Sequence, residues 1–171
     1  MNERSLHVGL VDTFAAQSFG EPGQRTFRVF ATTHSGEVSV WMEKEQLVVL
    51  GEAIGEMLQK VPDSQGLSPA STASTATISG EVAARAGSLA LTYDEAQDGF
   101  VFEAANLQDA TLRVQSLSFL LDRHQLAAAD DEIQDIVAAS RPRCTMCGQP
   151  LTDPAHFCPP SNGHARVQAP S

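Results

Sequence analysis

Cysteine, aromatic residues and long apolar runs are all scarce in this sequence. Its 171 residues include three cysteines, one tryptophan and one tyrosine, and no apolar run approaches the roughly 18 residues that a membrane-spanning helix needs. The first residues carry charges and lack the apolar stretch and small-residue cleavage site of a signal peptide. We therefore expect a cytoplasmic protein without a membrane partner.

Positive charge is scarce as well. The chain has 11 Lys+Arg against 21 Asp+Glu, a formal net charge of -10 at pH 7. Such an excess of negative charge repels phosphate backbones, so we expect no nucleic-acid partner. Hydrophobic residues make up 42% and charged residues 19%, which is typical of a globular protein, and the length suits one domain with a small appendage.

The first part of the chain shows the patterns of strands followed by a helix. Short apolar pieces between residues 6 and 19 predict a strand, and the Gly-Glu-Pro-Gly run at residues 20–23 predicts a turn. Alternating apolar and polar residues at 25–31 and 37–42 predict a hairpin. Apolar residues at helical spacing over residues 43–60 predict an amphipathic helix.

The second part shows similar patterns after a polar stretch. Residues 62–77 are rich in Ser, Thr, Pro and Ala and hold almost no large apolar side chain, so we expect a flexible loop inside the domain. Residues 88–93 and 100–104 predict a second hairpin, and residues 111–117 predict another strand. Residues 122–140 predict a second amphipathic helix.

Two segments, VSVWMEKEQL and LSFLLDRHQL, resemble each other. Each runs from a strand into an acid that can cap a helix, with a glutamine three residues later that can reach back to it. We expect such capping boxes at Glu43 with Gln46 and at Asp122 with Gln125. This internal similarity favours an α+β fold of two antiparallel sheet-plus-helix halves, with a possible internal duplication. The alternative is two locally similar junctions of separate origin.

All three cysteines lie close together near the C-terminal end. Cys144-x-x-Cys147 followed by glycine turns two thiolates toward one ion, and Cys158 with a histidine would complete a tetrahedral zinc site. His156 is the favoured fourth ligand because alternate side chains of an extended segment share a face, and it lies two residues before Cys158. His164 is the alternative.

Other roles for these cysteines fit less well. An odd number of cysteines in a cytoplasmic protein argues against a disulfide, and a redox Cys-x-x-Cys is expected beside a βαβ pattern, which the sequence lacks. Three thiolates and one imidazole fill a tetrahedral shell and leave no position for an activated water. We therefore expect a structural Zn²⁺ in a small zinc ribbon at residues 142–165, after an α+β body at 1–141 and before a disordered tail at 166–171.

Several motifs occur in order along nearly the whole chain. They are GEPGQRTF at residues 20–27, EKEQ at 43–46, RPRCTMCGQPL at 141–151, HFCP at 156–159 and Asn162-Gly163. With these motifs the chain resembles an uncharacterised bacterial family, domain-of-unknown-function family 3090. The resemblance implies two antiparallel sheet-and-helix halves that end in a zinc ribbon, and no established reaction. In the family pattern a glycine stands at the position of Ala155 and a basic residue at that of Pro160. These departures leave the four ligands intact and favour His156 over His164.

Arg25 is the remaining candidate for ligand binding. The glycines of the preceding turn could cradle a phosphate, but their spacing matches neither a P-loop nor a dinucleotide-binding motif. Arg25 itself could clamp a carboxylate or phosphate, or it could pair with one of the many acidic side chains.

Together these features favour a binding role over catalysis. Neither a Gly-x-Ser-x-Gly motif nor a recognisable Ser-His-Asp set occurs in the sequence. We expect a non-enzymatic adaptor that binds a protein partner, with its oligomeric state left open. The alternative is an enzyme or binding protein for a small anionic metabolite, which would use a cleft near Gly20 to Arg25.

Overall fold

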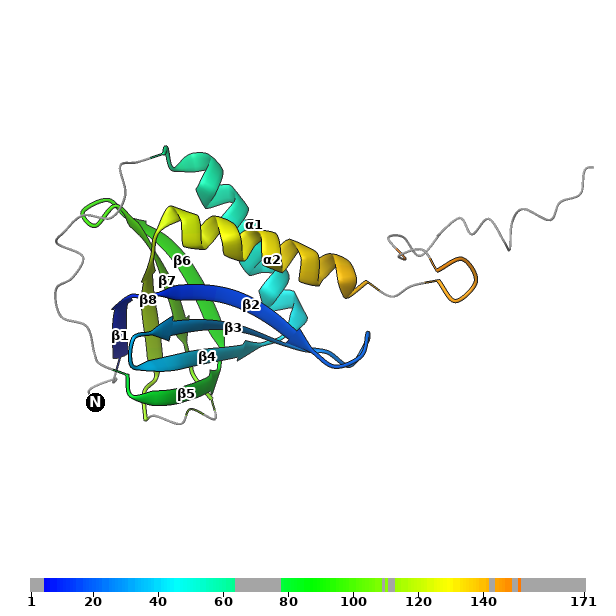
Figure 1. Cartoon of the computed structure of the whole chain (residues 1–171), viewed down its shortest axis with the longest axis horizontal. Coiled ribbons are helices and arrows are strands. Elements are labelled where there is room, and N and C mark those ends of the chain that lie inside the picture. The colour runs from blue at the N-terminus through cyan, green and yellow to red at the C-terminus, as the bar shows by residue number, and fades with distance from the viewer. Residues whose placement is uncertain are drawn as a thin grey trace, which may run out of the picture.

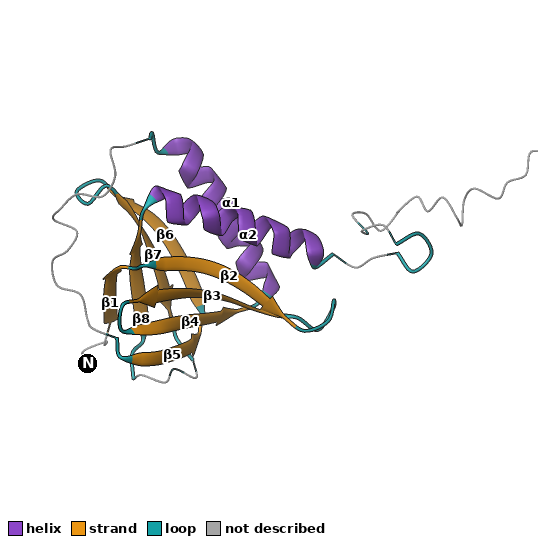
Figure 2. Cartoon of the chain, in the orientation of Figure 1, coloured by secondary structure: helices purple, strands orange, loops and turns teal. Residues whose placement is uncertain are grey.

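The computed structural model describes residues 5–63, 78–108, 110, 113–141, 144–148 and 151. Within them the chain forms eight strands and two helices, so the expected α+β class is confirmed (Figures 1 and 2). In chain order these are β1 (Ser5–Leu10), β2 (Thr13–Phe19), β3 (Thr26–Thr33), β4 (Gly36–Met42), α1 (Lys44–Lys60), β5 (Gly80–Arg85), β6 (Ser88–Asp94), β7 (Gly99–Ala105), β8 (Ser116–Leu121) and α2 (Arg123–Ala139).

The elements repeat one order. A first half, β1 to α1, and a second half, β5 to α2, each contain four strands and then a helix. Three strands of each half pair antiparallel, β2-β3-β4 in one sheet and β6-β7-β8 in the other. The first strand of each half joins the other half's sheet in parallel, since β1 pairs with β8 and β5 with β4. The predicted antiparallel halves are therefore confirmed only in part, because the halves exchange their first strands.

The chain passes from one sheet to the other at two equivalent corners. Between β1 and β2, the N–H groups of Val11 and Asp12 donate to carbonyl oxygens of β8 and β3 at 3.4 and 2.8 Å. Between β5 and β6, those of Ala86 and Gly87 donate to β4 and β7 at 2.9 and 3.1 Å. Because each corner is hydrogen-bonded to both sheets, it fixes the residue at which the chain changes sheet.

Each helix begins at a capping box that also holds one of these corners. Gln46 Oε1 accepts from the N–H of Glu43 at 2.9 Å, and Gln125 Oε1 accepts from the N–H of Asp122 at 3.0 Å, which confirms the two predicted caps. The Gln46 amide also donates to both carbonyl oxygens of the β5–β6 corner, at 3.3 and 3.4 Å. The Gln125 amide donates to both carbonyl oxygens of the β1–β2 corner, at 2.7 and 3.2 Å. The glutamine of each half therefore ties its helix to the corner that follows the strand donated by the other half.

The core lies between the sheets and beneath the two helices, which cross on one side of the molecule (Figure 1). Phe14 of β2 lies 5.4 Å from Phe102 of β7, ring centre to ring centre, and Phe102 stacks on Phe119 of β8 at 5.7 Å. The helices approach closely where Gly51 of α1 meets Ile133 of α2, since a Cβ on Gly51 would stand 2.8 Å from Ile133 Cγ2. Among the described residues, neither helix combines the length and apolar character needed to cross a membrane.

Three strand predictions need correction. Residues 6–19 form two strands rather than one, because the corner between β1 and β2 turns the chain into the other sheet. The strand predicted at residues 111–117 lies at Ser116–Leu121, where consecutive buried residues mark a strand covered on both faces. The strand at Gly80–Arg85 is not predicted from the sequence, because Val82 is its only large apolar residue.

Three segments with sequence predictions fall largely outside the described residues. These are the expected flexible loop at 62–77, the zinc ribbon at 142–165 and the tail at 166–171, of which the structure describes residues 62–63, 144–148 and 151. The loop, the ribbon and the tail therefore stay predictions.

Candidate functional site

Each helix is tied at its end by the first residue of the other helix. Arg123, at the start of α2, donates to two carbonyl oxygens at the end of α1, at 2.5 and 2.8 Å. Lys44, at the start of α1, donates from Nζ to Ser140 O at the end of α2, at 3.2 Å. Cations at these positions offset the negative end of the helix dipole. Lys44 therefore has a structural partner, as its counterpart in the repeat does.

Arg25 lies beside the same end of α2. Gly20 and Gly23 have φ angles of +96° and +93°, which glycine adopts readily, so the predicted turn before Arg25 is confirmed. Arg25 Nε donates to Gly20 O at 3.3 Å, and its Nη1 donates to Ser140 Oγ at 3.4 Å. The turn between β2 and β3 is thereby attached to the C-terminal cap of α2.

A small pocket of about 210 Å³ opens at this junction. Its walls include the cations Arg25 and Lys44, but also the carboxylates of Glu43 and Glu45. Both cations already donate to Ser140, and an incoming anion would meet the two carboxylates. The geometry favours a structural tie at this place, and the ligand-binding role of Arg25 stays a prediction.

Two of the predicted metal ligands lie in a described turn. The N–H of Gly148 donates to Cys144 O at 2.8 Å, and Gly148 has a φ of +71°, so the chain reverses directly after Cys147. Both cysteines are half-buried, and this turn suits the Cys-x-x-Cys-Gly arrangement of zinc sites. The other candidate ligands lie outside the described residues: His156, Cys158 and His164. Within the described parts, the structure groups no three metal-ligating side chains, and the zinc site stays a prediction.

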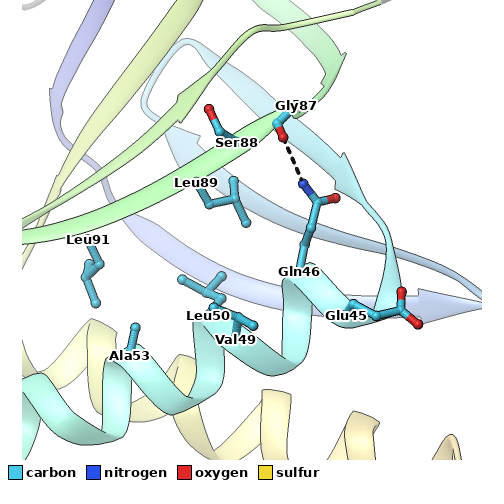
Figure 3. Close-up of a pocket in the computed structure, with 9 residues that line it drawn as sticks. All are labelled: Glu45, Gln46, Val49, Leu50, Ala53, Gly87, Ser88, Leu89 and Leu91. Atoms are coloured by element: carbon cyan, nitrogen blue, oxygen red, sulfur yellow. Dashed lines mark hydrogen bonds between the residues drawn. The ribbon is translucent and has the colours of Figure 1, made fainter.

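A groove with apolar walls lies between α1 and β6 (Figure 3). Its volume is about 340 Å³. Val49, Leu50 and Ala53 project from α1 toward Leu89 and Leu91 of β6. Val49 keeps 62% of its surface exposed, and both leucines of β6 are only half-buried. The groove is therefore an accessible apolar surface bounded by a helix and a strand.

Polar residues mark one end of this groove. Gln46 donates to Gly87 O at 3.4 Å, as the dashed line in Figure 3 shows. Glu45 stands at the same end and, among the described residues that line the groove, is the one that carries a charge. It makes no hydrogen bond or ion pair with any residue in the described part of the chain. Its carboxylate is therefore available to a bound partner.

The matching place in the other half is closed. There α2 lies against β2, and Glu132 Oε2 accepts a hydrogen bond from the N–H of Ala16 at 2.7 Å. When the two capping glutamines are aligned, Ala53 of α1 takes the position of Glu132. Ala16 is buried, whereas its counterpart Leu91 is half-exposed. The two helices therefore cover their edge strands to different extents.

A second polar and aromatic cluster surrounds Arg28 on the outer face of the sheet that holds β2 to β5. The Arg28 guanidinium lies within 5.7 Å of three ring centres, those of Phe19, Phe30 and Trp41. All of its nitrogens donate to neighbouring side chains, namely Gln17, Glu37 and Ser39. Because these donors are already used within the sheet, Arg28 is better suited to joining strands than to binding a ligand.

The groove could not be found from the sequence. Its only local signal is Val49, an apolar residue on the exposed side of a predicted helix, and single exposed apolar residues are ordinary on protein surfaces. The space lies between α1 and β6, which β5 separates in the chain, so no single segment of the sequence defines it. Arg25, which sequence reasoning did favour, lies at the end of α2. Neither it nor the described cysteines, Cys144 and Cys147, line the groove.

Comparison with known proteins adds a family but no activity. Residues 7–158 match the model of a protein family described as "Protein of unknown function (DUF3090)". The matched range takes in both halves and all three cysteines. No match was found among curated proteins or among solved structures.

Proposed function

Because the chain belongs to the DUF3090 family, whose description gives no activity, we propose from its surfaces that it is a non-enzymatic protein-interaction module of the cytoplasm. One observation carries the proposal: the groove between α1 and β6 is open, whereas the matching place between α2 and β2 is closed. Since both halves share one construction, the fold can close such a groove. An apolar groove left open in one half only is therefore better explained by a partner than by packing.

The chemistry of the groove suits a protein partner. Burying a side chain the size of valine or leucine against its walls contributes about 1.5–3 kcal/mol. The walls consist of side chains held by a helix and a strand, so little ordering is needed before binding. The strong negative charge of the chain favours partners with basic residues and raises their association rate.

Site-specific photo-crosslinking tests this proposal. A photoreactive phenylalanine analogue replaces Val49 in the groove or, as the control, Ala128, which is exposed at the matching position of α2. We expect Val49 to give a discrete covalent adduct with one protein, and Ala128 to give none. The adduct should disappear when Leu89→Glu is added, because a charge in the groove wall opposes apolar docking. Adducts of equal yield at both positions, or none at Val49, would contradict the proposal.

We also propose that the segment after α2 holds a structural Zn²⁺. Cys144, Cys147, His156 and Cys158 are the ligands that we assign, and the described turn at the first two supports this set. Three thiolates and one imidazole would fill the coordination shell, so the ion would stabilise the segment rather than activate water. His164 remains the alternative to His156.

Removal of one thiolate tests the zinc proposal. Cys147→Ser should abolish binding of one equivalent of zinc and increase amide exchange from residue 142 onward, since small zinc modules draw much of their folding free energy from the ion. The exchange of residues 5–141 should not change. Met146→Ala, which alters an exposed residue of the same turn, is the matched control and should keep its zinc. A Cys147→Ser protein that retains one equivalent of zinc would refute the assignment.

The anion-binding alternative at Arg25 has a separate test. If Arg25 serves mainly as a tie to Ser140, inorganic phosphate should leave the melting temperature unchanged, and Arg25→Ala should lower it slightly. A melting temperature that rises with phosphate in the native protein but not in Arg25→Ala would favour the small-metabolite hypothesis instead.

A further inference from the structure

We propose that the groove binds an extended segment of a partner protein, which adds as a strand along β6 and places a basic side chain beside Glu45. The inference rests on the proposed interaction function and specifies the partner's chemistry and its mode of binding. Three features carry it: the open edge of β6, the absence of a blocking side chain, and the charge at one end of the groove.

The edge of β6 presents backbone donors. Within the described residues β6 is the outer strand of its sheet and pairs only with β7. An antiparallel strand directs alternate N–H groups to its two sides. β2 and β6 pair with their neighbours in equivalent registers, which start with Thr13 opposite Thr32 and Ser88 opposite Ala105, so Leu91 takes the place of Ala16. Because the N–H of Ala16 points away from β3 to Glu132, the N–H of Leu91 points away from β7.

The acidic side chain of α2 that protects the β2 edge has no counterpart at the matching position of α1. Glu132 reaches from α2 and accepts the Ala16 N–H, which blocks that edge to a further strand. At the matching position α1 carries Ala53, whose methyl group cannot accept a hydrogen bond. In the described part of the chain, no side chain accepts the N–H of Leu91. Among the described residues, one edge is therefore closed by a side chain of α2, and the other offers a template for a strand.

The groove walls define the pattern of the bound segment. Side chains of an added strand would alternate between the groove and solvent. Those in the groove would meet Val49 and Ala53 on one side and Leu89 and Leu91 on the other. We therefore expect apolar, preferably β-branched residues at every second position, separated by polar ones. In this mode the main chain supplies affinity and the side-chain contacts supply specificity.

Charge selects the residue at one end of the segment. Glu45 lines the groove beside Gln46, at the end away from Leu91 (Figure 3). The carboxylate has no partner among the described residues, and the chain as a whole is strongly acidic. A lysine or arginine of the partner would pair with Glu45 there, and an acidic residue would be repelled.

Selection from a displayed library of random twelve-residue peptides against the full chain tests the inference. We expect the selected peptides to alternate apolar and polar residues and to carry Lys or Arg near one end. The critical variant is Ala53→Glu, which copies into α1 the carboxylate that Glu132 supplies in α2. It should weaken the selected peptides at least about tenfold, because its carboxylate competes for the Leu91 N–H. Ala128→Glu makes the same chemical change on the exposed face of α2 and should leave binding unchanged.

Two further variants separate the backbone contact from the charge contact. Leu91→Pro removes the N–H, whereas Leu91→Ala keeps it, so the proline variant should bind the peptides several-fold more weakly than the alanine variant. Glu45→Gln should weaken binding about threefold and reduce its dependence on salt. Glu52→Gln, an exposed position on α1 outside the groove, is the matched control and should do neither. Thermal melting confirms that each variant is folded.

The outcomes distinguish this inference from the proposed function. If the protein crosslinked at Val49 still binds Ala53→Glu, the interaction function stands and strand addition is wrong. If the selected peptides lack alternation or read as amphipathic helices, strand addition is wrong as well. If neither peptides nor a crosslinked protein bind at the groove, the interaction function fails and this inference fails with it.

Discussion

The two halves of the molecule agree in how they are held together and differ in what they leave exposed. In both, a glutamine of the capping box ties a helix to a corner, and the first residue of each helix binds the end of the other. They differ where the helices meet the edge strands: α2 closes the β2 edge through Glu132, and α1 leaves a groove beside β6. Residues that recur in both halves serve the fold, so the unmatched surface is the better place to look for function.

The largest expected effect concerns the helix crossing, which the repeat does not share. Gly51→Val should destabilise the protein by about 2–3 kcal/mol, because its side chain would overlap with Ile133 of α2 in a packed region. Gly55→Ala is the control on the same helix, since its Cβ would meet no atom within 4 Å. It should stabilise by about 0.5–1 kcal/mol through helix propensity. Denaturant unfolding measures both, and similar effects at the two positions would refute this picture of the crossing.

The ties at the helix ends should differ in strength. Arg123→Ala should cost about 2 kcal/mol, because it removes two charged hydrogen bonds and an ion pair with Asp63. Lys44→Ala removes one longer bond to Ser140 and should cost about 0.5–1 kcal/mol. Urea unfolding of both variants measures the two losses in the free energy of unfolding. A larger loss at Lys44 would contradict this prediction and mean that the junction near Arg25 contributes more stability than one hydrogen bond.

The two capping glutamines should also contribute unequally to the free energy of unfolding, with the glutamine of α2 contributing more than that of α1. Gln125→Ala should cost about 1–2 kcal/mol, because it leaves the Asp122 N–H and the β1–β2 corner without their partner. Gln46→Ala should cost about half as much, since its bonds to the β5–β6 corner are longer. Amide exchange locates the effect, which should appear at the corner named in each case. Uniform exchange across the whole chain would contradict the assignment.

The smallest expected effect is a response to pH in one of two equivalent turns. In the β6–β7 turn, the amide of Gln97 and the backbone N–H groups of Gln97 and Ala96 hold the pKa of Asp94 below its ordinary value. Because the pKa is lower in the folded state, ionised Asp94 stabilises the turn at pH values above the ordinary pKa of aspartate. This contribution is lost as the pH falls through the folded-state pKa. The β2–β3 turn relies instead on Arg25 and Ser140. NMR titration should show the first turn loosening in acid before the second, and Gln97→Ala should raise the pKa of Asp94.

The sequence by itself determined the local elements of this protein. The two helices, the caps at Glu43 and Asp122, the hairpins and the turn before Arg25 all follow from patterns within about twenty residues, because they depend on hydrogen bonds and apolar faces inside one segment. The matching strand-to-helix junctions also indicated two similar halves. The cysteine spacing indicated a zinc site, of which the structure describes one turn.

Only the tertiary structure decided how the halves combine and which surface remains open. The exchange pairs β1 with β8 and β5 with β4, between residues that are 44 or more positions apart in the chain, and the sequences of β1 and β5 contain no signal for that choice. Strand pairing and the distance between α1 and β6 depend on the packing of both halves together, so no single segment encodes them. The groove lies where Ala53 of α1 faces β6, beside the close approach of the two helices at Gly51, and only the folded chain brings these elements together.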